Sequence, residues 1–432
     1  GQGNPENAKG MTWGITMADA ILVNATPENS SYLTLDAEAI DVSNKYSSDF
    51  YLQNGTVLRN FFGTGSIWGR GGYLGRTAEF DLLPERLTFT YSSQFENKFY
   101  QLDEAIPTAK IRTMMAKSKR VFNNAVEDSE TPQYESPNDF ELAVAPDGWV
   151  TLNLANVFIR KELMSWQAKE IMPSVEEAAK HHFNEIWYYR VARFHNLEER
   201  KEYLDSVRKE HPNFYHTYID GPKKVSAAWY KQMQTKYPWN LEVEVDGGEW
   251  NGEYYMEFAN TERWTAIGKE RVEEEKKAMK AMPTYIKIWL IDKETGNRWG
   301  IRLHPFKTEE QEQNDYKIIY DDARLNGLYK IFQQAFPGRT RAHNISTPSI
   351  NQFATLKLKF DDHFELTEAY LQKDGQKFVL PDAEIHQRYE INNTAYYRCC
   401  IGESRCSIWW IFVVFLVIPT STKDCKCHAL CI

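Results

Sequence analysis

The middle of this chain carries helix-start signals between two stretches dominated by strand-forming residues. Ser174 and Glu177 form a capping-box pattern directly after Pro173, and Asn196 with Glu199 repeats it. Strand-rich sequence on both sides of these helices predicts an α+β protein. We expect two β-rich lobes with antiparallel sheets, joined by the helical middle segment.

The lobe boundaries follow these changes in pattern. We expect a flexible polar N-terminus over 1–10, a β-rich lobe over 11–172, a helical bridge over 173–238 and a second α+β lobe over 239–392. The remaining residues, 393–432, differ in character from everything before them. Single hydrophobic cores rarely grow past roughly 250–300 residues, so two lobes suit a chain of 432 residues.

The C-terminal tail is rich in cysteine and apolar residues. All 6 cysteines lie beyond residue 398, and Ile408 to Ile418 is a continuous apolar run. A membrane-spanning helix needs about 20 residues, so this run is too short to cross a bilayer. We interpret the tail as a non-native or poorly folded appendage; a membrane or partner anchor and a cysteine site are the alternatives.

Turn residues separate the strands expected in both lobes. A Pro-Asp-Gly turn at 146–148 precedes an alternation of Val150, Leu152 and Leu154, which would share one face of a strand. In the second lobe, "YIKIWLID" and "RWGIRLHP" flank the loop "KETGN" and predict a hairpin. The runs "FATLKLKF", "HFELTEAYL" and "QKFVLP" predict a β-meander.

The glycine-rich stretch 61–75 fails as a phosphate-binding loop. Trp68 stands where the dinucleotide-binding pattern needs a third glycine, and no Gly-Lys-Ser/Thr follows. The simplest interpretation is a mobile surface loop between strands. Trp68, Arg70 and Tyr73 lie on it, and Trp, Tyr and Arg are the usual anchors of protein interfaces.

Other candidate chemistry is sparse. His181 and Glu185 stand four apart on an expected helix and would need a third metal ligand from elsewhere, so an exposed helix face is the plainer reading. The pairs Asp321-Asp322 and Asp361-Asp362 lie beside turns or helix starts, where Asp is structurally favoured. We expect no catalytic group, metal or cofactor. The net charge of −9 argues against a nucleic-acid binder.

The blocks at residues 83–107 and 140–154 of the first lobe resemble a bacterial lipoprotein family of unknown-function domains. In "LPERLTFTYSSQFENKFYQLDEAIP", Tyr91 replaces the more usual Trp; in "FELAVAPDGWVTLNL", Asp147 replaces one glycine of an Ala-Pro-Gly-Gly turn. Trp13 in "TWGITM" fits the opening strand of the family. The other matching positions are Leu83, Pro84, Leu87, Ser93, Glu96, Tyr100, Ile106 and Pro107.

Many members of that family accompany type VI secretion lipase effectors. The resemblance therefore implies a non-enzymatic immunity protein that binds and neutralises a cognate phospholipase or lipase in the periplasm. It also implies a native lipoprotein held at the membrane by an N-terminal lipid anchor that is absent from this chain. The cysteine-rich tail departs from the family pattern.

For such an inhibitor we expect contacts from Trp68, Arg70 and Tyr73 and from the hairpin tip at Lys293, Glu294 and Asn297. Blocking the active-site cleft or the lid of the lipase would inhibit it. An envelope lipoprotein that binds lipid or another envelope protein is the alternative. A metal-dependent hydrolase using His181 and Glu185 is a lesser one.

Overall fold

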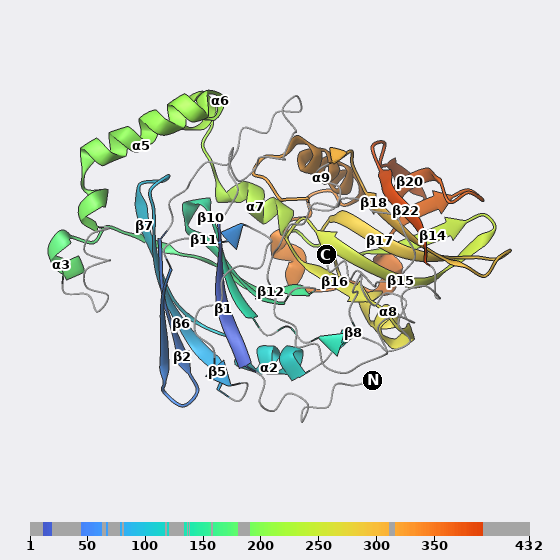
Figure 1. The fold of residues 1–432 in the computed structure, drawn as a ribbon, viewed down its shortest axis with the longest axis horizontal. Coiled ribbons are helices and arrows are strands. Elements are labelled where there is room, and N and C mark those ends of the chain that lie inside the picture. The colour runs from blue at the N-terminus through green and yellow to red at the C-terminus, as the bar shows by residue number, and fades with distance from the viewer. Residues whose placement is uncertain are drawn as a thin grey trace, which may run out of the picture.

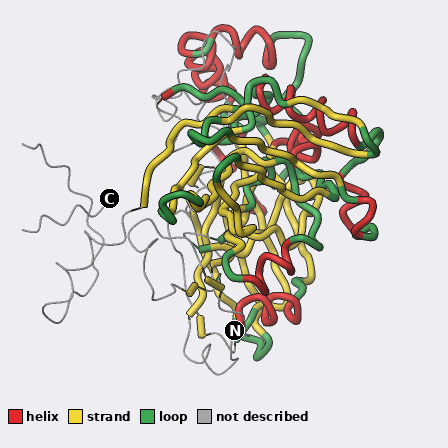
Figure 2. Tube along the Cα trace, turned by 90° about the vertical axis from the view of Figure 1, so that its right-hand side faces the viewer, coloured by secondary structure: helices red, strands yellow, loops and turns green. Residues whose placement is uncertain are grey.

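A computed structural model describes most of the two expected lobes. The described residues are 12–19, 45–62, 66–67, 78–79, 82–116, 119–120, 134–135, 137, 139–156, 159–179, 191–310 and 316–391. Figure 1 shows β-rich halves at the left and right with helices between and above them, which confirms the predicted α+β class. Turned by 90°, the strands run through the centre and most helices lie at the periphery (Figure 2).

The largest sheet of the described residues has 11 strands and runs through both halves. Its main path is β22-β18-β17-β15-β16-β12-β11-β10-β1-β4, and β5 pairs with β1. The first-lobe strands are β1 (Thr12–Asp19), β4 (Ser66–Ile67), β5 (Ala78–Glu79), β10 (Asp139–Ala145), β11 (Trp149–Ala155) and β12 (Arg160–Gln167). The second-lobe strands are β15 (Gly248–Phe258), β16 (Arg263–Ala266), β17 (Pro283–Asp292), β18 (Arg298–His304) and β22 (Glu384–Ile391).

The two halves meet directly in this sheet, as well as through the helical segment. β12 and β16 pair antiparallel, with Arg160 opposite Arg263. β1 pairs parallel with β10 and with β4, so the sheet is mixed and not purely antiparallel. A parallel pair needs a long connection between its strands, which local hairpin signals do not reveal.

A second sheet packs against the first within the N-terminal half. Its order is β13-β7-β6-β2-β3, built from β13 (Lys169–Ile171), β7 (Lys98–Ala105), β6 (Pro84–Ser93), β2 (Lys45–Leu52) and β3 (Val57–Phe62). Trp13, Phe50 and Phe140 meet in the core between the two sheets. β8 (Lys119–Arg120) and β9 (Tyr134–Glu135) form a separate small ribbon.

The motif that carried the family resemblance builds this core. Leu83, Leu87, Tyr91, Tyr100 and Ile106 are all buried there. These positions therefore have structural roles in the described fold.

The predicted alternation after the 146–148 turn is confirmed, since Val150, Leu152 and Leu154 are buried in the same core. The opposite face of β11 is buried as well: the Thr151 hydroxyl accepts from Gln234 of the helical segment, and Asn153 donates to Glu141 of β10. That second layer is a tertiary feature that the alternation did not indicate.

The predicted hairpin and meander of the second half are also confirmed. β17 and β18 pair around the 293–297 loop. The meander is β19 (Ala354–Phe360), β20 (Leu366–Lys373) and β21 (Gln376–Val379). β14 (Trp239–Val245) joins it in parallel with β19.

The helical middle begins where its capping signals place it. The Ser174 hydroxyl accepts from the Glu177 N–H at 3.1 Å, while the Glu177 carboxylate accepts from the Ser174 N–H at 2.9 Å. Asn196 caps the next helix, but Glu199 pairs with Arg193 instead of the cap backbone. The helices are α3 (Val175–Ala179), α5 (Leu197–Glu210), α6 (Pro212–Phe214), η4 (Tyr215–Ile219) and α7 (Ala227–Met233).

Helices outside the middle segment cover the ends of the sheets. α2 (Thr108–Ala116) begins directly after Pro107. α8 spans Lys269–Glu275, the first part of the charged run 269–280. α9 (Ala323–Ala335) continues through Gly327, and three short turns of helix complete the set: η3 (Pro146–Gly148), η6 (Arg341–Ile345) and η7 (Ile350–Gln352).

The 146–148 turn ties the first lobe to the helical segment. Asp147 has a positive φ of 62°, a conformation that favours glycine. Its N–H donates to Glu96 at 2.7 Å, and its carboxylate accepts from the Ala227 N–H at 3.1 Å. The Asp147 carboxylate therefore holds the first turn of α7, a contact that a glycine could not make.

Candidate functional site

Three predicted contact residues lie at the tip of the β17–β18 hairpin. Lys293, Glu294 and Asn297 are all exposed there. The Asp292 carboxylate accepts from the Glu294 N–H at 2.8 Å, and Gly296 takes a positive φ of 71° that closes the loop. The structure therefore confirms their position on an exposed, well-bonded turn; their role in binding remains a prediction.

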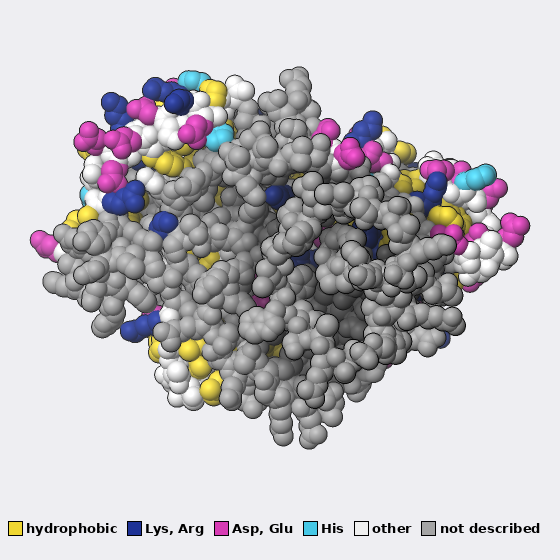
Figure 3. Space-filling view, in the orientation of Figure 1, with side chains coloured by type: hydrophobic (Ala, Val, Ile, Leu, Met, Phe, Trp, Pro, Cys, Tyr) yellow, Lys and Arg dark blue, Asp and Glu magenta, His cyan; other side chains and the backbone are white. Residues whose placement is uncertain are grey.

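Neighbouring turns bring further acidic groups to the same end. The Lys293 N–H donates to the Gly247 carbonyl at 3.0 Å, and the Asp246 N–H donates to the Phe360 carbonyl at 3.0 Å. Figure 3 shows acidic side chains at the right-hand end of the molecule, with Lys, Arg and His side chains among them. We call this surface the acidic hairpin end; it comprises Asp246, Asp292, Glu294, Asp361, Asp362 and Glu390.

The Asp361-Asp362 pair acts as a turn, as its sequence context indicated. The Asp361 carboxylate accepts from the N–H groups of His363 and Glu365, both at 2.9 Å. These donors, the Glu365 N–H foremost, hold the pKa of Asp361 below its usual value. Ligand atoms of Asp361, Asp362 and His363 lie within 4.8 Å of one another, but such groups are common on acidic surfaces without a metal.

The Asp321-Asp322 pair also has the predicted structural role. Asp322 caps α9, accepting from the Arg324 N–H at 2.8 Å. Asp321 accepts from the Tyr218 hydroxyl at 2.7 Å. Both carboxylates are thus used in holding α9 and η4 in place.

The remaining predicted positions lie outside the described residues. These are Trp68, Arg70 and Tyr73 of the glycine-rich stretch and His181 and Glu185 of the middle segment. The structure therefore does not relate them to the hairpin tip.

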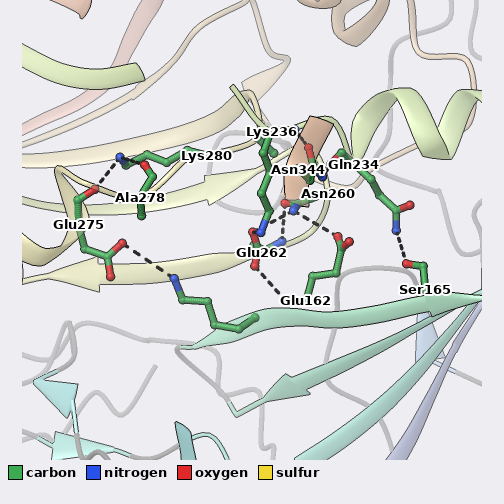
Figure 4. Close-up of polar contacts among 12 residues, drawn as sticks. Glu162, Ser165, Gln234, Lys236, Asn260, Glu262, Glu275, Ala278, Lys280 and Asn344 are labelled. Carbon is green, nitrogen blue, oxygen red and sulfur yellow. Dashed lines mark hydrogen bonds and ion pairs between the residues drawn. The ribbon is translucent and has the colours of Figure 1, made fainter. Parts of the chain in front are cut away.

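A network of charged side chains lies where the two halves meet, and the sequence did not point to it. Figure 4 shows Lys236, from the end of the helical segment, reaching Glu262 in the turn between β15 and β16. The Lys236 ammonium lies 3.1 Å from Glu262 Oε1, and Glu262 is 1% exposed. The other Glu262 oxygen accepts from the Glu162 N–H of β12 at 2.9 Å. One carboxylate thus joins both halves and the helical segment.

Glu162 is the carboxyl group that this network perturbs most among the described residues. Asn260 lies between the two carboxyls, donating to Glu262 at 2.9 Å and to Glu162 at 3.4 Å. Burial, opposed mainly by the charge of Lys236, raises the pKa of Glu162 to about 7. The same Lys236 holds the pKa of Glu262 below its usual value even though burial acts the other way. Glu162 is therefore readily protonated near neutral pH, whereas Glu262 stays ionised.

Lys280 stands at the far side of this network with its ammonium enclosed by oxygens. It donates to the carbonyls of Glu275 at 2.8 Å and Ala278 at 2.9 Å and to the Asn240 side chain at 3.0 Å. Burial lowers the pKa of Lys280 to about 7. All these oxygens come from the segments around α8 and β14, so Lys280 holds the turn after α8.

Perturbed carboxyl and amino groups of this kind can mark active sites, but structural ion pairs perturb pKa values too. Here each charged group is bonded to a neighbouring element. The arrangement is well suited to fastening the halves together. The sequence could not predict this network, because Glu162, Lys236 and Glu262 are far apart along the chain and each looks like an isolated charge.

The described residues therefore define a two-lobed α+β protein with a charged junction and an acidic hairpin end. Residues 36–215 match the sequence model of a family described as "Protein of unknown function (DUF2931)". The matched region covers the second sheet of the first half, β10 to β12 of the large sheet and the helical segment up to Tyr215. No curated protein and no solved structure matches the chain. Among the described helices, none is long and apolar enough to cross a membrane.

Proposed function

We propose that this chain is a non-enzymatic immunity protein that neutralises a type VI secretion phospholipase or lipase effector in the periplasm. The support begins with the motif resemblance in the first lobe, which falls within the region matched by the family of unknown function. In this proposal the inhibitor binds over the active-site cleft or lid of the lipase.

The acidic hairpin end is the structural observation that carries the proposal. Four of its six carboxylates are exposed, Asp292 and Asp361 are half-buried, and the backbone beneath them is fixed by turn hydrogen bonds. A preorganised surface loses little conformational entropy on binding. Surface charge of one sign also steers a partner of opposite charge and raises the association rate. The proposed partner surface is therefore basic.

Charge reversal at the hairpin tip tests this placement. The variant Glu294→Lys reverses one exposed charge at the tip, and Glu202→Lys on α5 makes the same change elsewhere. Binding to the cognate type VI secretion lipase effector that the proposal requires is measured by surface plasmon resonance at two salt concentrations. We expect Glu294→Lys to slow association severalfold at low salt, with Glu202→Lys close to wild type.

Two results bear on different parts of the proposal. Equal association rates for wild type and Glu294→Lys would remove the hairpin end from the interface. Absence of any binding by the folded wild-type chain to that lipase would contradict the immunity function itself.

A further inference from the structure

The segment 339–353 has an unusual charge pattern for this protein. It contains Arg339, Arg341 and His343 and no Asp or Glu, in a chain whose net charge is −9. It connects α9 to β19 and includes η6 and η7. The segment is therefore locally cationic although the protein as a whole is acidic.

Hydrogen bonds to the lobe junction hold this segment in one conformation. Arg339 Nε donates to the Lys236 carbonyl at 2.6 Å. The Asn344 side chain accepts from the Lys236 N–H and donates to the Gln234 carbonyl, each at 2.8 Å. Thr340 and His343 form a capping box at the start of η6. The segment is thus a fixed feature of the surface.

Two isoleucines on this segment project into solvent. Ile345 is 92% exposed and Ile350 is 58% exposed. The other large exposed hydrophobic residues of the described chain are Met172, Leu197 and Val379, on other elements. Two separate isoleucines provide too little apolar area for the core of a stable protein interface, which buries about 800 Å² per partner. Insertion into the boundary of a lipid bilayer needs only a few such side chains.

The cations near these isoleucines form no direct ion pair with a described carboxylate. Lys231 and Arg341 both stack on the Trp149 ring, with 4.3 Å and 4.7 Å to its centroid. Among the described residues, no carboxylate lies within ion-pair distance of Lys231, Arg339 or Arg341, although the charge of Arg341 helps to lower the pKa of the nearby Glu162. Other surface cations are paired more closely, as Arg86 is with Asp103. Three cations without a direct ion pair, on or next to the segment of the exposed isoleucines, are complementary to a negatively charged surface.

We propose that Lys231, Arg339, Arg341, Ile345 and Ile350 form a docking surface for an anionic membrane. The isoleucine side chains enter the headgroup boundary, and the three cations lie at the level of the lipid phosphates. Each basic residue near such a surface adds attraction that salt screens. This contact goes beyond the proposed immunity function and does not depend on it, because it requires no lipase.

Vesicle sedimentation tests the docking surface. The full chain is mixed with vesicles of phosphatidylglycerol and phosphatidylethanolamine, or of phosphatidylcholine alone. We expect binding to the anionic vesicles that weakens as salt is added. Burying one isoleucine contributes enough that Ile345→Ser should weaken binding about tenfold. The matched control Val379→Ser, at an exposed position on β21, should bind as wild type does.

A second variant separates the charge from the apolar contact. Arg341→Gln should lower binding to anionic vesicles and flatten its salt dependence, while circular dichroism confirms that both variants fold. Failure of the wild-type chain to bind anionic vesicles would overturn the proposal, as would equal losses in Ile345→Ser and Val379→Ser. Concentration-dependent dimers that disappear in Ile345→Ser would also overturn it, by assigning the surface to a second copy of the chain.

Discussion

Trp149 and Gln234 join the first lobe to the helical segment through one buried hydrogen bond. The indole Nε1–H of Trp149, at the start of β11, donates to Gln234 Oε1 at 2.9 Å just after α7 ends. The Gln234 amide then donates to the Thr151 hydroxyl at 2.8 Å. Both polar ends of Gln234 are thereby satisfied in an interior where unpaired groups are costly.

Replacing Gln234 should therefore loosen the junction. Gln234→Ala leaves the Trp149 N–H and the Thr151 hydroxyl without this partner, and we expect a loss of about 2–3 kcal/mol in the free energy of unfolding. Gln232→Ala, an exposed change on α7, is the matched control and should stay within about 0.5 kcal/mol of wild type. Chemical denaturation measures both. Equal stability of the two variants would contradict the role given to Gln234.

The glycine of the 146–148 turn should resist substitution. Gly148 has a φ of 72°, and a Cβ there would lie 2.6 Å from Tyr100 Cδ1. Gly148→Ala therefore combines backbone strain with a steric clash, and we expect it to cost about 2–4 kcal/mol. Gly375→Ala has a similar φ of 76° but open space around the added carbon. Gly375→Ala should therefore cost only about 1 kcal/mol in the free energy of unfolding. If Gly148→Ala destabilises the protein no more than this control, Tyr100 moves aside without cost.

The raised pKa of Glu162 predicts that the difference in stability between wild type and Glu162→Gln depends on pH. Its pKa rises from 4.5 to about 7 on folding, so the folded state keeps a proton that the unfolded state has lost. This group therefore lowers stability as pH increases from 4.5 to 7, and the full penalty remains above that window. Glu162→Gln cannot ionise and should be more stable than wild type by about 1–2 kcal/mol at pH 8.

Denaturation of wild type and Glu162→Gln across this pH range checks the sign. The advantage of the variant should shrink toward zero as the pH approaches 4.5, where both side chains are uncharged. A difference that stays constant with pH would mean that Glu162 titrates normally in the folded protein.

Lys280 should be far more sensitive than its neighbours on the same segment. Lys280→Met removes the ammonium and leaves the carbonyls of Glu275 and Ala278 without that donor. We expect a loss of about 2–4 kcal/mol. Lys277→Met, at an exposed position, should change stability by less than about 0.5 kcal/mol. Thermal unfolding compares the two, and a stable Lys280→Met would show that water satisfies those carbonyls.

Local signals in the sequence predicted the local parts of this fold. The Ser174–Glu177 capping box, the Asp322 cap and the 293–297 hairpin loop each depend on residues within a few positions of one another. The residues that form each cap or turn are close in the sequence, so these features can be predicted without knowing the tertiary structure.

Contacts between distant segments could not be read in the same way. The parallel pairing of Gly14 with Asp139 and the ion pair between Lys236 and Glu262 depend on how the lobes come together. Nothing adjacent to Lys236 distinguishes it from an exposed lysine. The exposure of the two isoleucines could not be predicted either, because isoleucine is usually buried in folded proteins.

Inhibition of a lipase tests the central claim most directly. The cognate lipase effector is titrated with the purified protein while hydrolysis of a phospholipid substrate is followed. We predict that activity falls to zero at one equivalent, and that Glu294→Lys shifts this titration to higher concentration. Full lipase activity in the presence of excess folded protein would contradict the proposed immunity function.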